Sequence, residues 1–553
     1  MLVYGDHHSI ADPRQRLHAL GRELESIASM PPAIDRHAAL VGALIEAGTL
    51  QQGVEDAGII SDALAAFTCG LAVAVLRSWD SGYAALGELP TLPTDELPRS
   101  VELRLPEGFA FYALYPEQYA VAARKLRLKG APRVIGIRSI GTTLGAMVAA
   151  ALGAAPPVTV RPFGDPFARE VELPTSVIDE GAHYVIVDEG PGLSGSSFGA
   201  VADWLEVHGV PLERVAFLPS HGGELGARAS EAHRSRWSRA QREPASFDSA
   251  FLSARFGDLT PFARGGPWQR LKFRAELGGK RVLLKFAGLG KIAAGKLEMA
   301  RALHANGLAP EPLGLVHGFL VERWVSGAHP LARDDTPVEQ IGSYIGRRAE
   351  LFPAPDASGA SLAELLEMAR RNVALALGEE AALQLQGWDV GAMQSRIRRV
   401  RTDNKLDRHE WLRTTDGGLI KTDALDHHQG HDLIGCQDPA WDLAGAIVEF
   451  DLGEDEARRL IAASGLPADA GLLDFYRVAY PAFRLGRQVL ATEMAGSTPA
   501  AGERHDRLFT FFKDGSAAGL GTNPWSIEQR NEPAREQSSY SWVHEEEASA
   551  IQL

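Results

Sequence analysis

Apolar residues are arranged differently in successive parts of this 553-residue chain. They recur at helical spacing from Arg14 to Ala28 and from Ala38 to Ile45, and nearly every position from Asp62 to Trp79 is apolar. A proline pair and a polar stretch over 48–56 separate these segments. The pattern predicts a helical cap over residues 1–95 that covers a neighbouring domain.

Short apolar runs alternate with helical patterns over residues 96–255. The pattern predicts strands over 133–138, 158–161, 184–188 and 214–218, with helices over 144–152 and 197–207. Such alternation is typical of a doubly wound α/β domain with a parallel sheet, which binds its ligands at the carboxyl ends of the strands. Polar, glycine-containing turns follow three of the predicted strands at that edge.

The third of these strands ends in two carboxylates, Asp188 and Glu189, and a Gly/Ser-rich turn follows. Glycines let backbone N–H groups approach an anion, hydroxyls add donors, and the start of the next helix carries partial positive charge. The turn therefore suits a phosphate, and the carboxylates suit sugar hydroxyls or a divalent cation. The predicted phosphate-binding residues are Gly192, Ser194, Gly195, Ser196 and Ser197.

This strand, acidic pair and hydroxyl-rich turn resemble the 5-phosphoribosyl 1-diphosphate (PRPP) motif of type I phosphoribosyltransferases, although the turn comes one residue later and carries Ser for Thr. The resemblance implies a mobile hood over 161–170, containing Arg161 and Arg169. It also implies Mg²⁺ and PRPP as ligands, and carboxylates that stabilise positive charge on the ribose. The implied pyrophosphate loop contains Arg138, Ser139, Gly141 and Thr142.

A second pattern begins after residue 255. Alternating residues around Gly278-Gly279 predict a β-hairpin whose second strand ends near Lys285, and a helix over 293–306 carries Glu298. Asp403, His409 and Asp423 follow in that order. The segment from Gln437 to Ala444 then reads Gln-Asp-Pro-Ala-Trp-Asp-Leu-Ala.

This order resembles the superfamily of protein kinases and aminoglycoside phosphotransferases, and it implies a two-lobed α+β domain over residues 256–520. By resemblance, Lys285 pairs with Glu298 at the phosphates of ATP, Asp403 is catalytic, and His409 and Asp423 bind the metal. The usual His-Gly-Asp sequence is absent, which leaves either an altered kinase or a binding-only domain.

A histidine-rich stretch follows Asp423 and leaves two interpretations open. It fits a transition-metal cluster or a hydrogen-bonded loop beside the kinase metal site. The residues concerned are Asp426, His427, His428, His431 and Asp432.

Composition narrows the class of protein. The chain has 45% hydrophobic and 23% charged residues, and its net charge of −15 argues against a broad nucleic-acid or anionic-membrane surface. Its two cysteines, Cys69 and Cys436, have no paired metal spacing, so a reducing cytoplasm is expected. Residues 521–553 are polar and predict a disordered tail.

The sequence is therefore interpreted as a cytoplasmic enzyme that transfers a phosphoribosyl group from PRPP to a small-molecule acceptor, coupled to a kinase-like domain. Two alternatives remain. One is an ATP-dependent small-molecule phosphotransferase whose first domain senses PRPP or another ribose phosphate. The other is a non-catalytic regulator that binds nucleotides.

Overall fold

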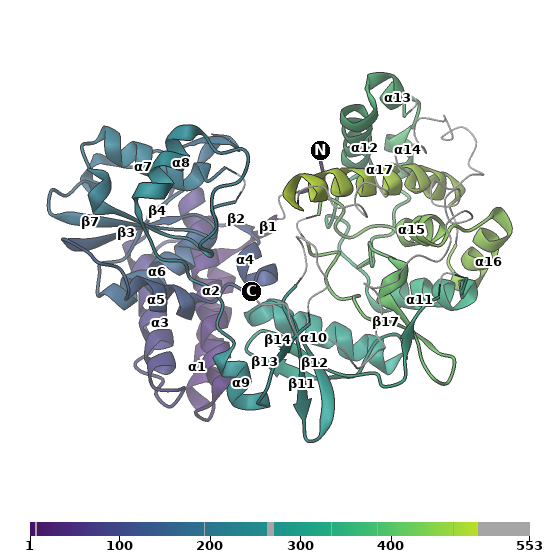
Figure 1. Cartoon of the computed structure of the whole chain (residues 1–553), viewed down its shortest axis with the longest axis horizontal. Coiled ribbons are helices and arrows are strands. Elements are labelled where there is room, and N and C mark those ends of the chain that lie inside the picture. The colour runs from purple at the N-terminus through teal and green to yellow at the C-terminus, as the bar shows by residue number, and fades with distance from the viewer. Residues whose placement is uncertain are drawn as a thin grey trace.

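Two halves lie side by side in the computed structural model (Figure 1). Elements α1 to α9 form the first half, and β10 to α17 form the second. The predicted tail over 521–553 lies outside the described residues. The structure describes residues 1–495 except Asp6, His7, Leu193, 263–269, Arg333, Gln384, His431 and Ala468.

Three helices begin the first half: α1 (Pro13–Ser29), α2 (Ile34–Asp56) and α3 (Asp62–Asp80). Asp12 caps α1 by accepting a hydrogen bond from the N–H of Arg14 at 2.9 Å. By length and composition, α3 is apolar enough to cross a membrane. It nevertheless packs on α2 and on α6 (Ile140–Leu152), and its Leu71 and Val75 are fully buried. α3 is therefore a core helix of this half.

The predicted parallel sheet is present beside these helices. In spatial order its strands are β4 (Val158–Val160), β3 (Ala131–Ile137), β7 (Ala182–Val187), β8 (Val215–Leu218) and β9 (Gln241–Arg242). Helices α5 (Pro116–Ala123) and α6 lie on one face, and α7 (Ser196–Val207) and α8 (Glu231–Arg239) lie on the other (Figure 1). The carboxyl ends of the parallel strands meet at one edge, which brings the three polar turns together.

Shorter elements complete the first half. They are β1 (His8–Ala11), β2 (Val101–Arg104), α4 (Glu107–Phe111), β5 (Phe163–Asp165), β6 (Ala168–Glu170), α9 (Ala250–Phe256) and the 3₁₀ turns Thr175–Val177 and Leu212–Arg214. Strands β5 and β6 form a hairpin at the place of the predicted hood.

The second half opens with an antiparallel sheet. Its spatial order is β10 (Thr260–Pro261), β11 (Lys272–Leu277), β12 (Lys280–Phe286), β14 (Phe319–Arg323) and β13 (Pro312–Val316). Helix α10 (Gly290–Ala305) packs against β13 and β14. A smaller sheet contains β15 (His329–Pro330), β16 (Trp411–Arg413) and β17 (Leu419–Lys421), with the 3₁₀ turn Arg408–Glu410 before β16.

Helices make up the rest of the second half. They are α11 (Val338–Leu351), α12 (Leu362–Leu377), α13 (Glu379–Leu383), α14 (Val390–Gln394), α15 (Ala440–Phe450), α16 (Glu454–Ser464) and α17 (Ala470–Ala495). The first residues of the chain lie against this region, beside α12 and α17 (Figure 1). Val3 is buried there, and its carbonyl accepts a hydrogen bond from the N–H of Leu433 at 2.9 Å. The chain thus starts in the second half before it crosses to the first.

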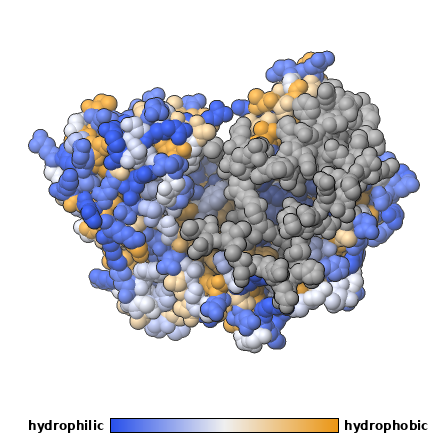
Figure 2. All heavy atoms as spheres, in the orientation of Figure 1, coloured by the Kyte–Doolittle hydropathy of each residue, from blue (hydrophilic) through white to orange (hydrophobic). Residues whose placement is uncertain are grey.

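The two halves also share a hydrophobic core. Tyr115 of the segment before α5 contacts the ring of Phe286 on β12, with centroids 6.0 Å apart, and Phe251 of α9 contacts Phe319 on β14 at 6.2 Å. On the face shown in Figure 2, hydrophilic residues cover most of the first half and apolar residues are scattered among them. The four aromatic side chains that join the halves are all buried.

Candidate functional site

The acidic pair lies at the carboxyl edge of the parallel sheet. Asp188 and Glu189 directly follow β7 and are half-buried. Burial raises the pKa of Asp188 to about 7, against the opposing charge of Arg161. Burial, together with repulsion from Asp188 and Glu107, raises the pKa of Glu189 to about 8. A cation or a set of hydroxyl donors at this edge would relieve the cost of ionising both groups.

The Gly/Ser turn leads from the acidic pair to α7. Ser194 and Ser196 are buried, their hydroxyls are 3.0 Å apart, and Gly195 has the positive φ of 63° that a glycine readily adopts. The Ser196 hydroxyl donates to the carbonyl of Pro166 at 2.8 Å. The tip of the β5–β6 hairpin therefore covers the turn, and an anion that binds Ser196 must displace this carbonyl.

The other residues predicted to bind phosphate differ in their burial and in their position around this turn. Gly192 has a φ of 62°, Ser197 is half-buried in the first turn of α7, and Leu193 lies outside the described residues. Arg169 is half-buried on β6, opposite Gly164 in the hairpin. Arg169 therefore belongs to the β5–β6 hairpin, and the serines belong to the turn that this hairpin covers.

The predicted pyrophosphate loop lies at the start of α6. Ser139 precedes the helix, while Gly141 and Thr142 are buried in its first turn. A Cβ atom at Gly141 would lie 2.6 Å from the carbonyl oxygen of Val187, so only glycine allows this close packing on β7. The Thr142 hydroxyl has no hydrogen-bond partner among the described residues.

Two arginines at this edge are already paired with carboxylates from the N-terminal helices. Arg138 Nε lies 3.0 Å from Glu55 Oε2, and its Nη1 lies 3.2 Å from Asp56 Oδ1. Arg161 Nε donates to the same Asp56 oxygen at 3.2 Å. Burial alone would raise the pKa of Asp56, but the hydrogen bond and charge of Arg161 lower it. The end of α2 thus neutralises the two cations expected to hold a diphosphate, a contact that the sequence analysis did not predict.

A second candidate site lies between the two sheets of the second half. Lys285 of β12 is buried, and its Nζ lies 3.5 Å from Asp423 Oδ1 and 3.9 Å from Glu322 Oε2. The same ammonium group donates to the carbonyl of Thr422 at 3.0 Å. The charge of Lys285 outweighs the effect of burial and holds the pKa of Asp423 well below its usual range. Lys285 and Asp423 therefore form a largely buried ion pair between the two sheets.

The predicted Lys285–Glu298 pair is wrong. Glu298 is exposed, because the inward face of α10 is formed by Lys296 and by apolar residues that include Ala293 and Met299. Lys296 points inward instead, with its Nζ 3.1 Å from Asp426 Oδ2. In the sequence, Ala293 and Met299 lie three residues before and after Lys296, and this helical spacing of apolar residues indicates that position 296 faces inward.

Asp403 is fully buried and is held by several partners. Its Oδ2 accepts a hydrogen bond from Tyr344, while its Oδ1 lies 3.4 Å from Lys421 Nζ and 3.3 Å from His427 Nδ1. Burial opposes ionisation, but Lys421 and His427 keep the pKa of Asp403 below its usual range. The group is therefore an ionised carboxylate with both oxygens engaged, and an acceptor hydroxyl must replace one of its partners.

The segment Gln437–Ala444 holds the backbone around Asp403 through hydrogen bonds. Asp442 lies in the first turn of α15, and its carboxylate accepts hydrogen bonds from the backbone N–H groups of Asp403 at 2.8 Å and Asn404 at 2.9 Å. Burial and the charge of Asp403 raise the pKa of Asp442 to about 6. This contact fixes the backbone that carries Asp403.

Glu410, rather than the predicted His409, approaches Asp423. His409 is exposed in the 3₁₀ turn, whereas ligand atoms of Glu410, Asp423 and His427 lie within 4.8 Å of one another. Burial and Lys405 would lower the pKa of His427, but its hydrogen bonds to Asp403 and Asp423 raise it. The carboxylates of Glu410 and Asp423 fit Mg²⁺, which prefers oxygen ligands, whereas His427 offers a nitrogen that Mg²⁺ does not favour.

The alternative cluster of histidines and aspartates is divided among different contacts. Asp426 pairs with Arg270 at 2.7 Å and with Lys296, and Asp432 pairs with Arg487. His428 is buried, and burial keeps its pKa well below the usual range. His431 lies outside the described residues.

Helix α4 separates the two candidate sites and contacts both. A Cβ atom at Gly108 would lie 2.7 Å from Glu189 Oε2, so this glycine packs directly on the acidic pair. On its other side, the carbonyl of Ala110 accepts a hydrogen bond from Lys296 at 3.4 Å, and the ring of Phe111 faces Arg270 at 4.8 Å. The two sites therefore share α4 as a wall.

No protein-family profile matches the chain, and no curated protein matches it. Solved structures that resemble it are kinase-like. The choline kinase LicA from Streptococcus pneumoniae has 14% identity and a TM-score of 0.36, over 48% of this chain and 97% of its own. The macrolide 2'-phosphotransferase MphH from Brachybacterium faecium has 15% identity and a TM-score of 0.33, over 48% of this chain and 98% of its own.

Spectinomycin phosphotransferase APH(9)-Ia, in complex with ADP and spectinomycin, has 13% identity and a TM-score of 0.32, over 48% of this chain and 92% of its own. These similarities are too weak to assign a substrate or an activity. The comparisons give no support to the phosphoribosyltransferase resemblance.

Proposed function

We propose that this protein is a cytoplasmic, ATP-dependent phosphotransferase that acts on a small molecule at the site between the two sheets of its second half. The observation that supports this proposal is the ion pair between Lys285 and Asp423, at 3.5 Å. Lys285 belongs to one sheet, and Asp423 follows the other sheet in the chain. A buried ammonium group suits nucleotide phosphates, and an adjacent carboxylate suits the metal that accompanies them. Glu410 supplies a second carboxylate beside Asp423.

The proposed reaction moves the terminal phosphoryl group of ATP to an acceptor hydroxyl, releasing ADP and the hydroxyl proton. Lys285 orients the phosphates, and Asp423 and Glu410 would hold Mg²⁺, which neutralises phosphate charge when bound. Asp403 accepts a hydrogen bond from the acceptor after the Tyr344 hydroxyl moves away from it. Lys421 and His427 keep Asp403 ionised for that task.

The test uses purified full-length protein, Mg-ATP labelled in the terminal phosphate, and a fraction of small metabolites. Label on an organic metabolite supports phosphotransfer, and Asp423→Ala should remove it. Glu298→Gln is the matched control, because it changes an exposed carboxylate on α10. Nucleotide binding without labelled product would contradict catalysis and leave a binding-only domain.

The first half has a second candidate function, PRPP binding and phosphoribosyl transfer. It is favoured by the raised pKa values of Asp188 and Glu189, beside a Gly/Ser turn that begins a helix. In this proposal the serines and the start of α7 bind the 5-phosphate, and the carboxylates stabilise charge on the ribose. Pyrophosphate release from Mg-PRPP should be lost in the Asp188→Asn/Glu189→Gln variant; unchanged release would reject this role.

A further inference from the structure

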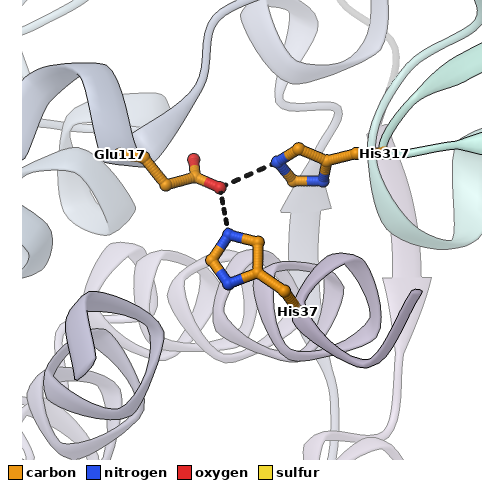
Figure 3. A group of neighbouring side chains, drawn as sticks. All are labelled: His37, Glu117 and His317. Atoms are coloured by element: carbon orange, nitrogen blue, oxygen red, sulfur yellow. Dashed lines mark hydrogen bonds and ion pairs between the residues drawn. The ribbon is translucent and has the colours of Figure 1, made fainter. Parts of the chain in front are cut away.

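Three buried side chains meet where the two halves of the protein join (Figure 3). His37 comes from α2, Glu117 from α5, and His317 from the turn between β13 and β14. His37 and Glu117 are 0% exposed and His317 is 2% exposed. The Nε2 atoms of His37 and His317 lie 2.7 Å and 2.8 Å from the same oxygen, Glu117 Oε1. Three distant segments of the chain thus converge on one point.

Hydrogen bonding leaves this cluster incompletely satisfied. Both imidazoles face Oε1, while Glu117 Oε2 and His317 Nδ1 have no hydrogen-bond partner among the described residues. No lysine or arginine of the described chain forms an ion pair with Glu117; its two recorded partners are the histidines. A buried polar atom without a hydrogen-bond partner is costly. A cation at the point of convergence would engage the two facing ring nitrogens and the carboxylate directly.

We propose that His37, Glu117 and His317 bind a zinc ion that joins the two halves. Two imidazole nitrogens and a carboxylate are a donor set that zinc accepts, whereas Mg²⁺ and Ca²⁺ prefer oxygen ligands. Glu117 Oε2 or a water molecule supplies the fourth ligand. These ligand atoms all lie within 4.8 Å of one another.

The surroundings of the cluster fit a structural metal. His37 Nδ1 lies 3.0 Å from the Ser78 hydroxyl, a contact that fixes the ring so that Nε2 faces Glu117. Aromatic rings pack around the histidines. The ring centroid of His37 lies 5.8 Å from that of Trp79 and 5.0 Å from that of Tyr83, and the centroid of His317 lies 4.9 Å from that of Tyr115. Burial of all three side chains suits a structural role better than contact with a substrate. The role of the site is to fix the β13–β14 turn of the second half against α2 and α5 of the first.

The direct test is the metal content of purified full-length protein after dialysis, measured by mass spectrometry. About one zinc ion per chain is expected, and replacement by Co²⁺ should give the visible absorption of cobalt bound to nitrogen and oxygen. Removal of zinc with a chelator should lower the melting temperature, and added zinc should restore it. These measurements use the unaltered chain, so they do not depend on a variant that folds.

Variants then locate the site. Glu117→Gln and His317→Gln should lose the zinc and the chelator effect, whereas His329→Gln should keep both, because His329 is exposed and lies outside the cluster. Wild-type protein that binds neither zinc nor cobalt, and melts at the same temperature with and without chelator, would overturn the proposal. Zinc retained in both cluster variants would also overturn it.

Discussion

The ammonium group of Lys285 lies 3.5 Å from the carboxylate of Asp423, and this ion pair joins the two sheets of the second half. Lys285 is on β12 of the larger sheet, and Asp423 follows β17 of the smaller one. Lys285 is buried and Asp423 is half-buried, and charged groups are costly in such places unless they are paired. Their pairing defines the place where a nucleotide and its metal are proposed to bind.

Lys285→Met is predicted to destabilise the protein even without ligand. The substitution leaves Glu322 and Asp423 near each other without their cation, and breaking a buried pair costs about 3–5 kcal/mol. A marked fall in melting temperature is expected. Lys280→Met is the control, because Lys280 is exposed on the same strand. Equal melting of the two variants would show that the buried pair contributes nothing to stability.

The stability contributed by the acidic pair should fall as the pH rises. The folded state holds protons on Asp188 up to about pH 7 and on Glu189 up to about pH 8, whereas the unfolded chain loses them near pH 4. Wild-type protein therefore loses stability between about pH 4 and about pH 8. The Asp188→Asn/Glu189→Gln variant lacks this loss, so its melting temperature relative to wild type should increase from about pH 5 to about pH 8.5. A difference that is constant with pH, as expected for the exposed control Glu172→Gln, would contradict the assignment.

Asp56→Asn should strengthen the binding of diphosphate anions to the first half. Asp56 pairs with both Arg138 and Arg161, and removal of its charge leaves Arg161 without a carboxylate partner and Arg138 with Glu55 alone, so both can attract an anion more strongly. Titration calorimetry with Mg-pyrophosphate should show roughly tenfold tighter binding, equivalent to about 1.4 kcal/mol. Asp62→Asn, at an exposed position on the next helix, should bind as wild type does. Weaker binding by Asp56→Asn would show that Asp56 positions the arginines for the anion.

Ser196→Ala should loosen the hairpin that covers the phosphate-binding turn. The Ser196 hydroxyl holds the carbonyl of Pro166 at 2.8 Å, and no such bond is recorded for the half-buried Ser197 within the described chain. Amide hydrogen exchange over 163–170 should become faster in Ser196→Ala than in Ser197→Ala. Saturating Mg-PRPP should change the exchange of the same amides in wild-type protein. Identical exchange in all these samples would exclude the hairpin as a ligand-responsive cover.

Local patterns in the sequence predicted the strands of the first half well. The expected strand over 184–188 corresponds to β7 (Ala182–Val187), and that over 133–138 corresponds to β3 (Ala131–Ile137). Both are short apolar runs followed by polar turns, a signal contained within a few residues. The position of Asp188 and Glu189 at the end of a strand is predictable for the same reason, because both residues directly follow such a run.

Contacts between distant segments were not predictable from these patterns. The kinase resemblance implies Glu298 as the partner of Lys285, whereas the inward face of α10 places Lys296 toward Asp426. The pairing of Asp56 with the arginines depends on how α2 packs across the sheet edge. His37 and Glu117 are 80 residues apart in the sequence, and folding brings them to 2.7 Å from each other. Nothing in one chain's local periodicity records such packing.

The most direct test of the central claim is a calorimetric titration of Mg-ATP into the full-length protein, beside Asp423→Ala and Glu298→Gln. Wild-type protein and Glu298→Gln should bind one Mg-ATP per chain, and their melting temperatures should rise with nucleotide concentration. Asp423→Ala should give no heat of binding and no shift in melting temperature, while its response to Mg-PRPP stays intact. Wild-type protein that shows neither heat nor a melting shift with saturating Mg-ATP would contradict the proposed nucleotide site.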